Sequence, residues 1–137
     1  MAISAILHDL GKSKIEIEII NKNGKLTNQE FEKIKEHPEY GYELAKKAGI
    51  TNEKVLSGIR HHHERLDGSG YPDKLLSEEI KLFPKIIAIC DMFDALTTKR
   101  PYKEPMSTFD SFKLMKSASN HLDTTLLIKF MQMMVKK

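Results

Sequence analysis

Histidine and aspartate gather in a few short stretches of this sequence, and both side chains can bind metal ions or transfer protons. His8 is followed at once by Asp9, histidines occupy positions 61–63, and His37 precedes a proline. A helix turns about 100° per residue, so two neighbouring histidines near a helix end can face one centre, but all three cannot without a local distortion. Imidazole and carboxylate without cysteine suit iron, manganese, zinc, cobalt or nickel better than calcium or magnesium. A His-Asp pair alone is also found at ordinary polar helix ends, so the clustering carries the metal hypothesis.

Two further carboxylates lie in an apolar stretch. Residues 84–97 are apolar on nearly every side, which predicts a buried helix. Asp91 and Asp94 are three residues apart and therefore share a face of that helix. Buried carboxylates are costly unless a cation or a metal pairs with them. We therefore expect a cationic or metal partner for this pair.

A carboxylate shared by several histidine ligands is what a two-metal centre needs. Two ions about 3.5–4 Å apart lower the pKa of a bridging water from 15.7 towards about 7, and the resulting hydroxide can attack phosphorus in line. Cationic side chains would hold the remaining phosphate oxygens. Lys12, Arg100 and Lys103 are the candidates, and an ordinary surface charge is the alternative for each.

The elements that must position these residues read as helices. Residues 1–8 end near a glycine, and Thr27 with Glu30 forms a capping box that opens a helix towards residue 47. Pro38 predicts a kink or break in that helix near His37. The other predicted helices cover residues 52–64, 84–97, 107–115 and 123 or 124 onwards.

Two stretches read as loops instead. Residues 15–20 alternate β-branched side chains but are closed by Asn23-Gly24, so we expect an ordered loop. Residues 67–72 hold two glycines and a proline and predict a second loop. With roughly six helices and no convincing sheet, the sequence predicts an all-α fold.

Composition limits the class of protein. The 137 residues are 40% apolar and 30% charged, which fits a single domain over residues 1–137. No run of 18 apolar residues or basic leader is present, so no membrane span or signal peptide is expected. The only cysteine, Cys90, predicts a reducing, cytoplasmic location. A net charge of +3 is too mild for a surface that binds long nucleic acid.

Four motifs taken together resemble the HD-GYP phosphodiesterases of the HD superfamily. They are His8–Lys12 (HDLGK), His37–Glu39 (HPE), His62–Pro72 (HHERLDGSGYP) and Asp91–Leu96 (DMFDAL), and Arg100–Tyr102 (RPY) continues the match. The string from His62 to Pro72 is highly specific, whereas the His-Asp pair alone is not. The similarity covers residues 5 to 103 and extends more loosely to residue 123.

The resemblance implies a bacterial signalling enzyme with an HD-superfamily helical bundle. Its members hydrolyse cyclic di-GMP to the linear dinucleotide or to GMP with two or three metal ions, often iron or manganese. We expect two divalent ions here, iron or manganese first, with zinc, nickel, cobalt or magnesium as alternatives. The Gly-Tyr-Pro loop of this family is also a proposed contact for diguanylate cyclase (GGDEF) domains.

The resemblance also assigns roles by position. The metal ligands would be His8, Asp9, His37, His62, His63 and Asp91, with Asp9 bridging and, with Lys12, acting in catalysis. The substrate contacts would be Lys12, Tyr71, Asp94, Arg100 and Lys103. His61 would lie next to the site rather than in it.

Two features depart from the family pattern. Family members carry helices before the His-Asp motif, with a further histidine ligand, so we expect an amino-terminally shortened domain with one ligand fewer. Absent helices would leave an apolar face open, which predicts a homodimer or another partner chain. Near the carboxyl terminus, residues 119–124 read SNHLDT in place of the usual GTHFDP.

Three functions are consistent with these observations. The preferred one is a metal-dependent phosphodiesterase that hydrolyses cyclic di-GMP with a metal-activated hydroxide. The alternative is a catalytically impaired module that binds cyclic di-GMP or a diguanylate cyclase. An HD-type phosphohydrolase acting on ordinary nucleotides ranks last, because it leaves the Gly-Tyr-Pro loop unexplained. The choice between cyclic di-GMP and a mixed cyclic GMP-AMP dinucleotide stays open.

Overall fold

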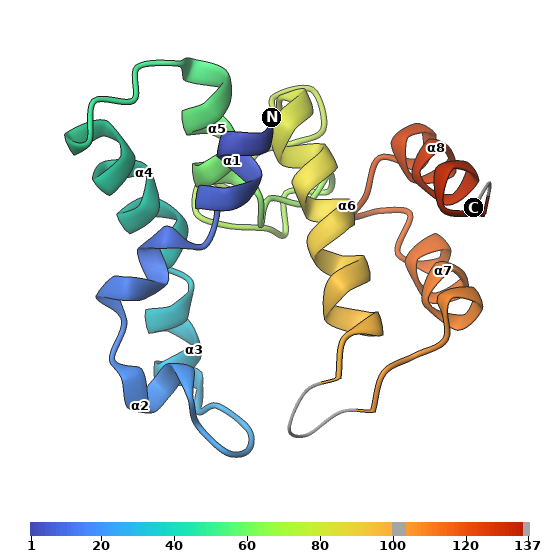
Figure 1. Cartoon of the computed structure of the whole chain (residues 1–137), viewed down its shortest axis with the longest axis horizontal. Coiled ribbons are helices and arrows are strands. Elements are labelled where there is room, and N and C mark those ends of the chain that lie inside the picture. The colour runs from blue at the N-terminus through green and yellow to red at the C-terminus, as the bar shows by residue number, and fades with distance from the viewer. Residues whose placement is uncertain (100–103, 136–137) are drawn as a thin grey trace.

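The computed structural model describes residues 1–99 and 104–135, and within these ranges the regular structure is helical (Figure 1). In chain order the elements are α1 (Ala2–Leu7), the 3-10 helix η1 (Leu10–Lys14), α2 (Ile17–Ile20), α3 (Asn28–Ile34), α4 (His37–Lys47), α5 (Glu53–His61), α6 (Leu82–Thr97), α7 (Thr108–Ser117) and α8 (Thr124–Val135). The described residues contain no strand, and one isolated bridge pairs Asp67 with Leu76. The all-α prediction is confirmed.

The described residues contain eight α-helices and the 3-10 helix η1. The α-helices are more numerous than expected for two local reasons. Residues 15–20, expected as a loop, include the four-residue helix α2. The expected break near His37 is complete, so that α3 and α4 are separate helices. Pro38 lies in the first turn of α4, where its missing N–H breaks no helical hydrogen bond.

Side-chain caps begin three of the helices. The caps at Thr27 and Ser107 were predicted from the sequence, and the cap at Asn52 was not. The Thr27 hydroxyl accepts from the Glu30 N–H at 3.2 Å, and the Glu30 carboxylate accepts from the Thr27 N–H at 2.7 Å. The Ser107 hydroxyl likewise accepts from the Asp110 N–H at 3.0 Å. Asn52 caps α5 by accepting the N–H groups of Lys54 and Val55. Each cap satisfies N–H groups that have no partner within the helix.

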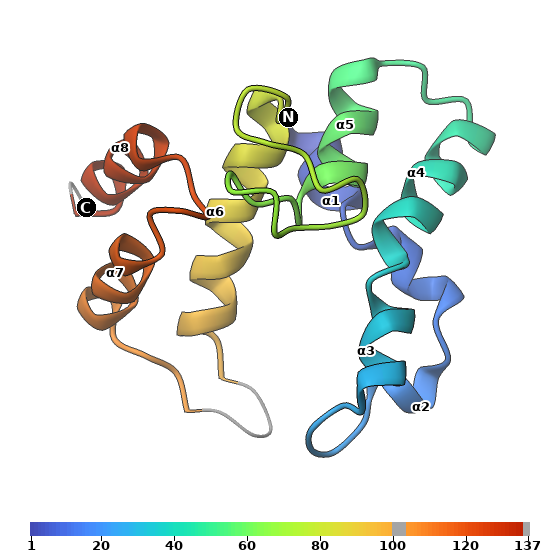
Figure 2. The ribbon, with the colours of Figure 1, turned by 180° about the vertical axis from the view of Figure 1, so that it is seen from behind.

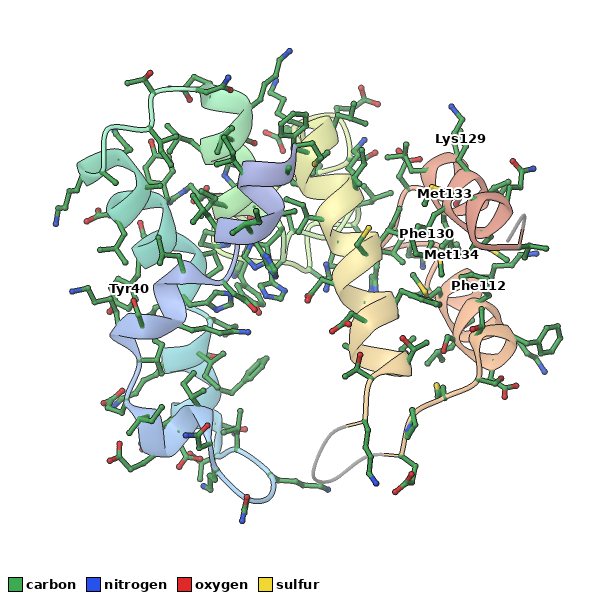
Figure 3. All side chains as sticks on the ribbon, in the orientation of Figure 1. Tyr40, Phe112, Lys129, Phe130, Met133 and Met134 are labelled. Atoms are coloured by element: carbon green, nitrogen blue, oxygen red, sulfur yellow. The ribbon has the colours of Figure 1, made fainter. Side chains whose placement is uncertain are left out.

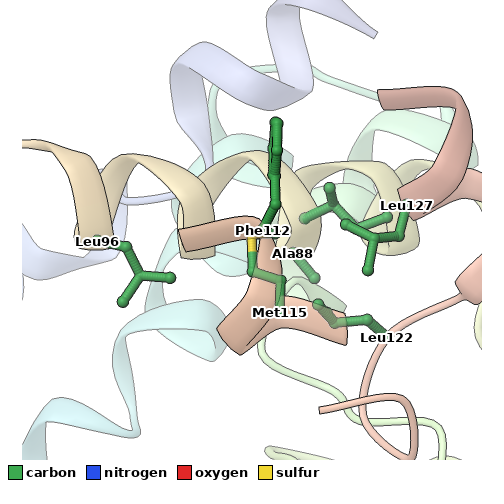
Figure 4. Packing of buried hydrophobic residues seen from close by; sticks show 7 residues of the cluster. Ala88, Leu96, Phe112, Met115, Leu122 and Leu127 are labelled. Carbon is green, nitrogen blue, oxygen red and sulfur yellow. The ribbon is translucent and has the colours of Figure 1, made fainter. Parts of the chain in front are cut away.

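Helix α6 separates two groups of helices (Figures 1 and 2). On one side α1 and α4 pack on α5, η1 packs on α4, and α5 contacts α6. A small core there consists of Ala45, Val55, Leu56 and Ile59. On the other side α7 and α8 enclose a second core with α6, made of Ala88, Ile89, Leu96, Phe112, Met115, Leu122 and Leu127 (Figure 4).

The prediction that α6 is buried all round is wrong in part. Its buried residues are Pro84, Ile87, Ala88, Ile89 and Leu96. Cys90 and Asp94 are exposed, and the Asp91 side chain is 33% exposed. The neighbours α5, α7 and α8 cover only part of the helix circumference, so these side chains stay open despite the apolar sequence around them. No helix in the described ranges has the length and apolar character that crossing a membrane requires.

Candidate metal centre

Four side chains from three separate segments converge beside α5. Asp9 lies between α1 and η1, His37 begins α4, and His62 and His63 follow the end of α5. One potential ligand atom from each lies within 4.8 Å of all the others. The exposed fractions of the His37 and His62 side chains are only 1% and 0%.

A glycine permits the approach of the first two segments. A Cβ atom at Gly11 would lie 1.8 Å from the carbonyl oxygen of His37 and 2.5 Å from the Gly41 nitrogen. Any other residue would therefore push η1 away from α4 and separate Asp9 from His37. The HDLGK motif thus needs its glycine for packing as much as its histidine and aspartate for chemistry.

The backbone fixes the protonation of three imidazoles in the same way. The Nδ1 atoms of His8, His37 and His62 lie 2.6, 2.7 and 2.8 Å from the carbonyl oxygens of the residues three positions earlier, Ala5, Ile34 and Ile59. A carbonyl only accepts, so each Nδ1 carries the proton. In the neutral form of each ring, the Nε2 lone pair is then the one left for a metal.

These lone pairs point at one another. The Nε2 atoms of His37 and His62 are 3.2 Å apart, and Asp9 Oδ1 lies 3.2 Å from the first and 3.9 Å from the second. When both rings are neutral, three acceptors so close together repel unless a proton or a metal ion lies among them. The donor set, imidazole nitrogen with a shared carboxylate, fits a divalent transition metal.

The acid-base properties of the cluster suit metal binding. Burial raises the pKa of Asp9, but hydrogen bonds from His37 and Lys12 outweigh burial and hold that pKa well below its usual range. Burial lowers the pKa of His62 to about 3 and also lowers that of His63. The carboxylate is therefore ionised and these two imidazoles neutral at neutral pH, which are the forms that bind metals.

A second pair of candidate ligands flanks the first cluster. His8 Nε2 lies 3.5 Å from Asp9 Oδ2 and 3.8 Å from Asp91 Oδ1. The Asp91 carboxylate raises the pKa of His8, although burial opposes it, and His8 lowers the pKa of Asp91. Asp9 therefore lies between the two groups, with one oxygen towards His37 and the other towards His8.

Lys12 contacts the centre directly. Its Nζ atom donates to Asp9 Oδ2 at 2.7 Å. The side chain remains 39% exposed, so the ammonium group neutralises Asp9 and can also reach an anion from solvent.

The loop after α5 brings Tyr71 onto the cluster. The Tyr71 ring stacks on His63 with centroids 4.8 Å apart and planes at 22°. Burial raises the pKa of Tyr71 to about 12, so the phenol is neutral.

The remaining predicted residues lie further out. His61 turns away from the cluster, with its ring nitrogens at Ser57 Oγ and Asp73 Oδ2. Asp94 accepts from the Thr98 hydroxyl at 2.9 Å and, with His8 and Asp91, lines a cavity of about 290 Å³. Arg100 and Lys103 lie outside the described residues.

Glu64 lies inside the most specific motif, but no role was predicted for it from the sequence. Its carboxylate is 3% exposed and accepts the backbone N–H groups of Asp73 at 2.7 Å and Leu75 at 2.9 Å. A carboxylate directly after the paired histidines His62 and His63 was the available signal. Its backbone partners, 9 and 11 residues away, could not be read from the sequence.

Comparison with known proteins shows the family of this chain. Residues 1–126 match the family model described as HD domain. A cyclic di-GMP phosphodiesterase of Pseudomonas aeruginosa is 35% identical over 130 residues, 95% of this chain and 31% of that protein. A cyclic di-GMP phosphodiesterase response regulator of Xanthomonas campestris is 48% identical over 105 residues, 74% of this chain and 27% of that protein.

A third relative carries a different substrate in its name. A 3'3'-cGAMP-specific phosphodiesterase of Vibrio cholerae is 44% identical over 100 residues, 72% of this chain and 19% of that protein. The chain thus spans a third or less of the length of these curated relatives.

Proposed function

We propose that this chain, which belongs to the HD-domain family, is a metal-dependent phosphodiesterase of cyclic dinucleotides. Its resemblance to the HD-GYP members of the family is confirmed by its relatives. The observation that carries the proposal is the convergence of Asp9, His37 and His62, whose acceptor atoms face one another at 3.2–3.9 Å. The substrate class is taken from the relatives.

The family and the His/Asp cluster together indicate divalent metal binding. We propose two ions that share Asp9, one held with His37, His62 and His63 and the other with His8 and Asp91. Iron or manganese suits this donor set, and zinc, nickel, cobalt or magnesium are the alternatives. When bound, such ions lower the pKa of water and neutralise charge on a phosphodiester.

The side chains of the protein would orient the substrate. Lys12, already on Asp9, would approach a phosphate oxygen, since an ammonium group stabilises negative charge that develops there. Arg100 and Lys103 are proposed as further phosphate contacts, with Tyr71 and Asp94 at the edge of the substrate site. Buried His37 and His62 would keep bulk water away from one side of the reacting bond.

Cyclic di-GMP is the proposed substrate, because it stands in the names of relatives that match 95% and 74% of this chain. Hydrolysis would give the linear dinucleotide or GMP. A relative specific for 3'3'-cGAMP makes the mixed dinucleotide the necessary comparison.

The test is anaerobic turnover by the full chain loaded with ferrous iron or manganese. Cyclic di-GMP and 3'3'-cGAMP are supplied in parallel and the products separated by chromatography. We expect cleavage of cyclic di-GMP by the parent and by Asp110→Asn, whose exposed carboxylate only supports the start of α7. Asp9→Asn should lose at least about a hundredfold in rate, as expected when a metal-bridging charge is removed.

Each other outcome has a defined meaning. Cleavage of 3'3'-cGAMP alone would change the substrate assignment. Binding of cyclic di-GMP by calorimetry without product would support the alternative, a module that binds the dinucleotide or a cyclase. Equal rates for Asp9→Asn and the parent would contradict the proposal.

Several finer properties remain predictions. We propose that residues 1–137 form one domain and that the protein acts in the cytoplasm. The Gly-Tyr-Pro loop is the proposed contact for a GGDEF domain. Exposed Ile3 and Ile6 on α1 support the predicted homodimer, which light scattering during size-exclusion chromatography would test.

A further inference from the structure

His63 differs from the other histidines of the centre in how its ring is held. His8, His37 and His62 are each fixed by a backbone carbonyl at Nδ1. Among the described residues, the His63 side chain makes no hydrogen bond. Its contacts are with rings, namely Tyr71 with a centroid distance of 4.8 Å, His62 with 4.2 Å and His37 with 5.0 Å. Only the Tyr71 contact is a near-parallel stack, with 22° between the planes.

Tyr71 is itself held on His63 by its backbone. The Tyr71 N–H donates to the carbonyl oxygen of His63 at 3.3 Å. The preceding residue, Gly70, is packed so tightly that a Cβ would lie 2.4 Å from the Arg65 nitrogen and 2.5 Å from the His63 carbonyl oxygen. The loop therefore lies directly against the backbone that carries the ligand.

Two anchors hold the far side of the same loop. Buried Glu64, the residue after His63, accepts the N–H groups of Asp73 and Leu75. The Asp73 carboxylate accepts in turn from Arg60 Nε and Nη2, at 2.8 and 2.9 Å, and lies 2.8 Å from His61 Nε2. Arg60 and His61 form the last residues of α5, directly before His62. The loop is thus tied on both sides of Tyr71 to the segment that presents the two histidines.

We infer that Tyr71 is a positioning residue for the metal centre. Its ring replaces the carbonyl contact that His63 lacks, and Glu64 holds the loop so that the ring stays in place. This role extends the proposed function, on whose metal centre it rests, and it differs from a substrate contact made by the phenol hydroxyl. A stacked ring needs no hydroxyl, so the two roles predict different results for Tyr71→Phe.

The test measures Mn²⁺ binding to the full chain by calorimetry without substrate. We expect Tyr71→Phe to bind like the parent, since the aromatic face is kept. Tyr71→Leu should weaken binding about tenfold or more, the usual effect of losing a group that orients a metal ligand. Glu64→Gln should weaken it as well, because an amide oxygen accepts but its NH₂ group cannot accept the second N–H.

Tyr40→Leu is the matched control. Tyr40 lies on α4, and its hydroxyl donates to Glu36 at 2.5 Å. Figure 3 shows Tyr40 at a distance from α6. This variant should bind Mn²⁺ like the parent. Equal affinity for Tyr71→Leu and the parent would overturn the inference and leave the proposed function standing. Equal weakening of Tyr71→Phe and Tyr71→Leu would also overturn it, because the hydroxyl would then be the group that matters.

A measurement on the parent guards against a variant that fails to fold. In the metal-free parent, proton NMR should show nuclear Overhauser contacts between the rings of Tyr71 and His63. Absence of those contacts would overturn the inference whatever the variants do. Failure of the parent to bind Mn²⁺, iron or zinc would overturn the proposed function and this inference together.

Discussion

The imidazoles of His37 and His62 face each other with their Nε2 atoms 3.2 Å apart. In their neutral forms, each ring donates its one N–H, at Nδ1, to the backbone carbonyl of Ile34 or Ile59. Neither ring can donate to the other in this protonation state. The nearby Asp9 carboxylate adds a third acceptor. A bound cation relieves the repulsion among them, so metal binding should stabilise the fold as well as prepare the site.

The three consecutive histidines allow a test with a matched control. His62→Ala should weaken Mn²⁺ binding at least about tenfold, because it removes a buried ligand, an effect of about 1.4 kcal/mol or more. His61→Ala should have a much smaller effect, since that ring contacts Ser57 and Asp73. Calorimetric titration of the two variants distinguishes these outcomes. Equal losses would show that His61 also serves the centre.

At the scale of elements, the end of α5 and the loop that follows behave as one unit. Arg60 and His61 close α5 and hold Asp73, while Glu64 holds the loop backbone. The loop is fixed by side chains from the segment before it and also by backbone contacts, among them the bridge between Asp67 and Leu76 and the hydrogen bond from the Tyr71 N–H to the His63 carbonyl oxygen. This arrangement places Tyr71 beside His63 within a short stretch of chain.

The Asp73 contacts predict a pH effect on stability. The Arg60 hydrogen bond lowers the pKa of Asp73 from 3.8 to about 2, so the pair stabilises the folded state above about pH 4 and loses this effect as the pH falls to 2. Because Asp73 is 34% exposed, the contribution is at most about 1 kcal/mol. Urea unfolding should show the parent more stable than Asp73→Asn at pH 5, with the difference shrinking towards pH 2. A difference independent of pH would contradict this account.

Over the whole molecule, the larger apolar core lies away from the metal cluster. Phe93, Phe112 and Phe130 contact one another within it, with centroids 5.3–6.2 Å apart, and Figure 3 labels the last two. Met115 in the same core is 0% exposed. The four side chains of the cluster, Asp9, His37, His62 and His63, come instead from segments on the other side of α6 and from the residues that follow α5.

This separation predicts that core stability and metal affinity can be changed independently. Met115→Ala should lower the free energy of unfolding by about 2–5 kcal/mol, as for other buried methionines. Met133→Ala, at a side chain 59% exposed on α8, should change it little. Urea unfolding measures both, and Mn²⁺ titration of the folded Met115→Ala chain should match the parent. Weaker binding by that variant would show that the two sides of α6 are coupled.

Features that depend on neighbours along the chain could be predicted from the sequence. The capping box at Thr27, the break at Pro38 and the helical class follow from interactions within about four residues, and the structure confirms them. The motifs from His8 to Asp91 likewise sufficed to identify the family. Their individual roles in binding and catalysis remain predictions.

Features that depend on contacts between distant segments became visible only in the folded chain. Packing brings the Nε2 atoms of His37 and His62, 25 residues apart in the sequence, to 3.2 Å from each other. The buried partners of Glu64 and the open side of α6 also emerge only when the chain is folded. The physical reason is that a sequence pattern gives the face a side chain occupies on its own helix, whereas its partners depend on which helices pack against that face.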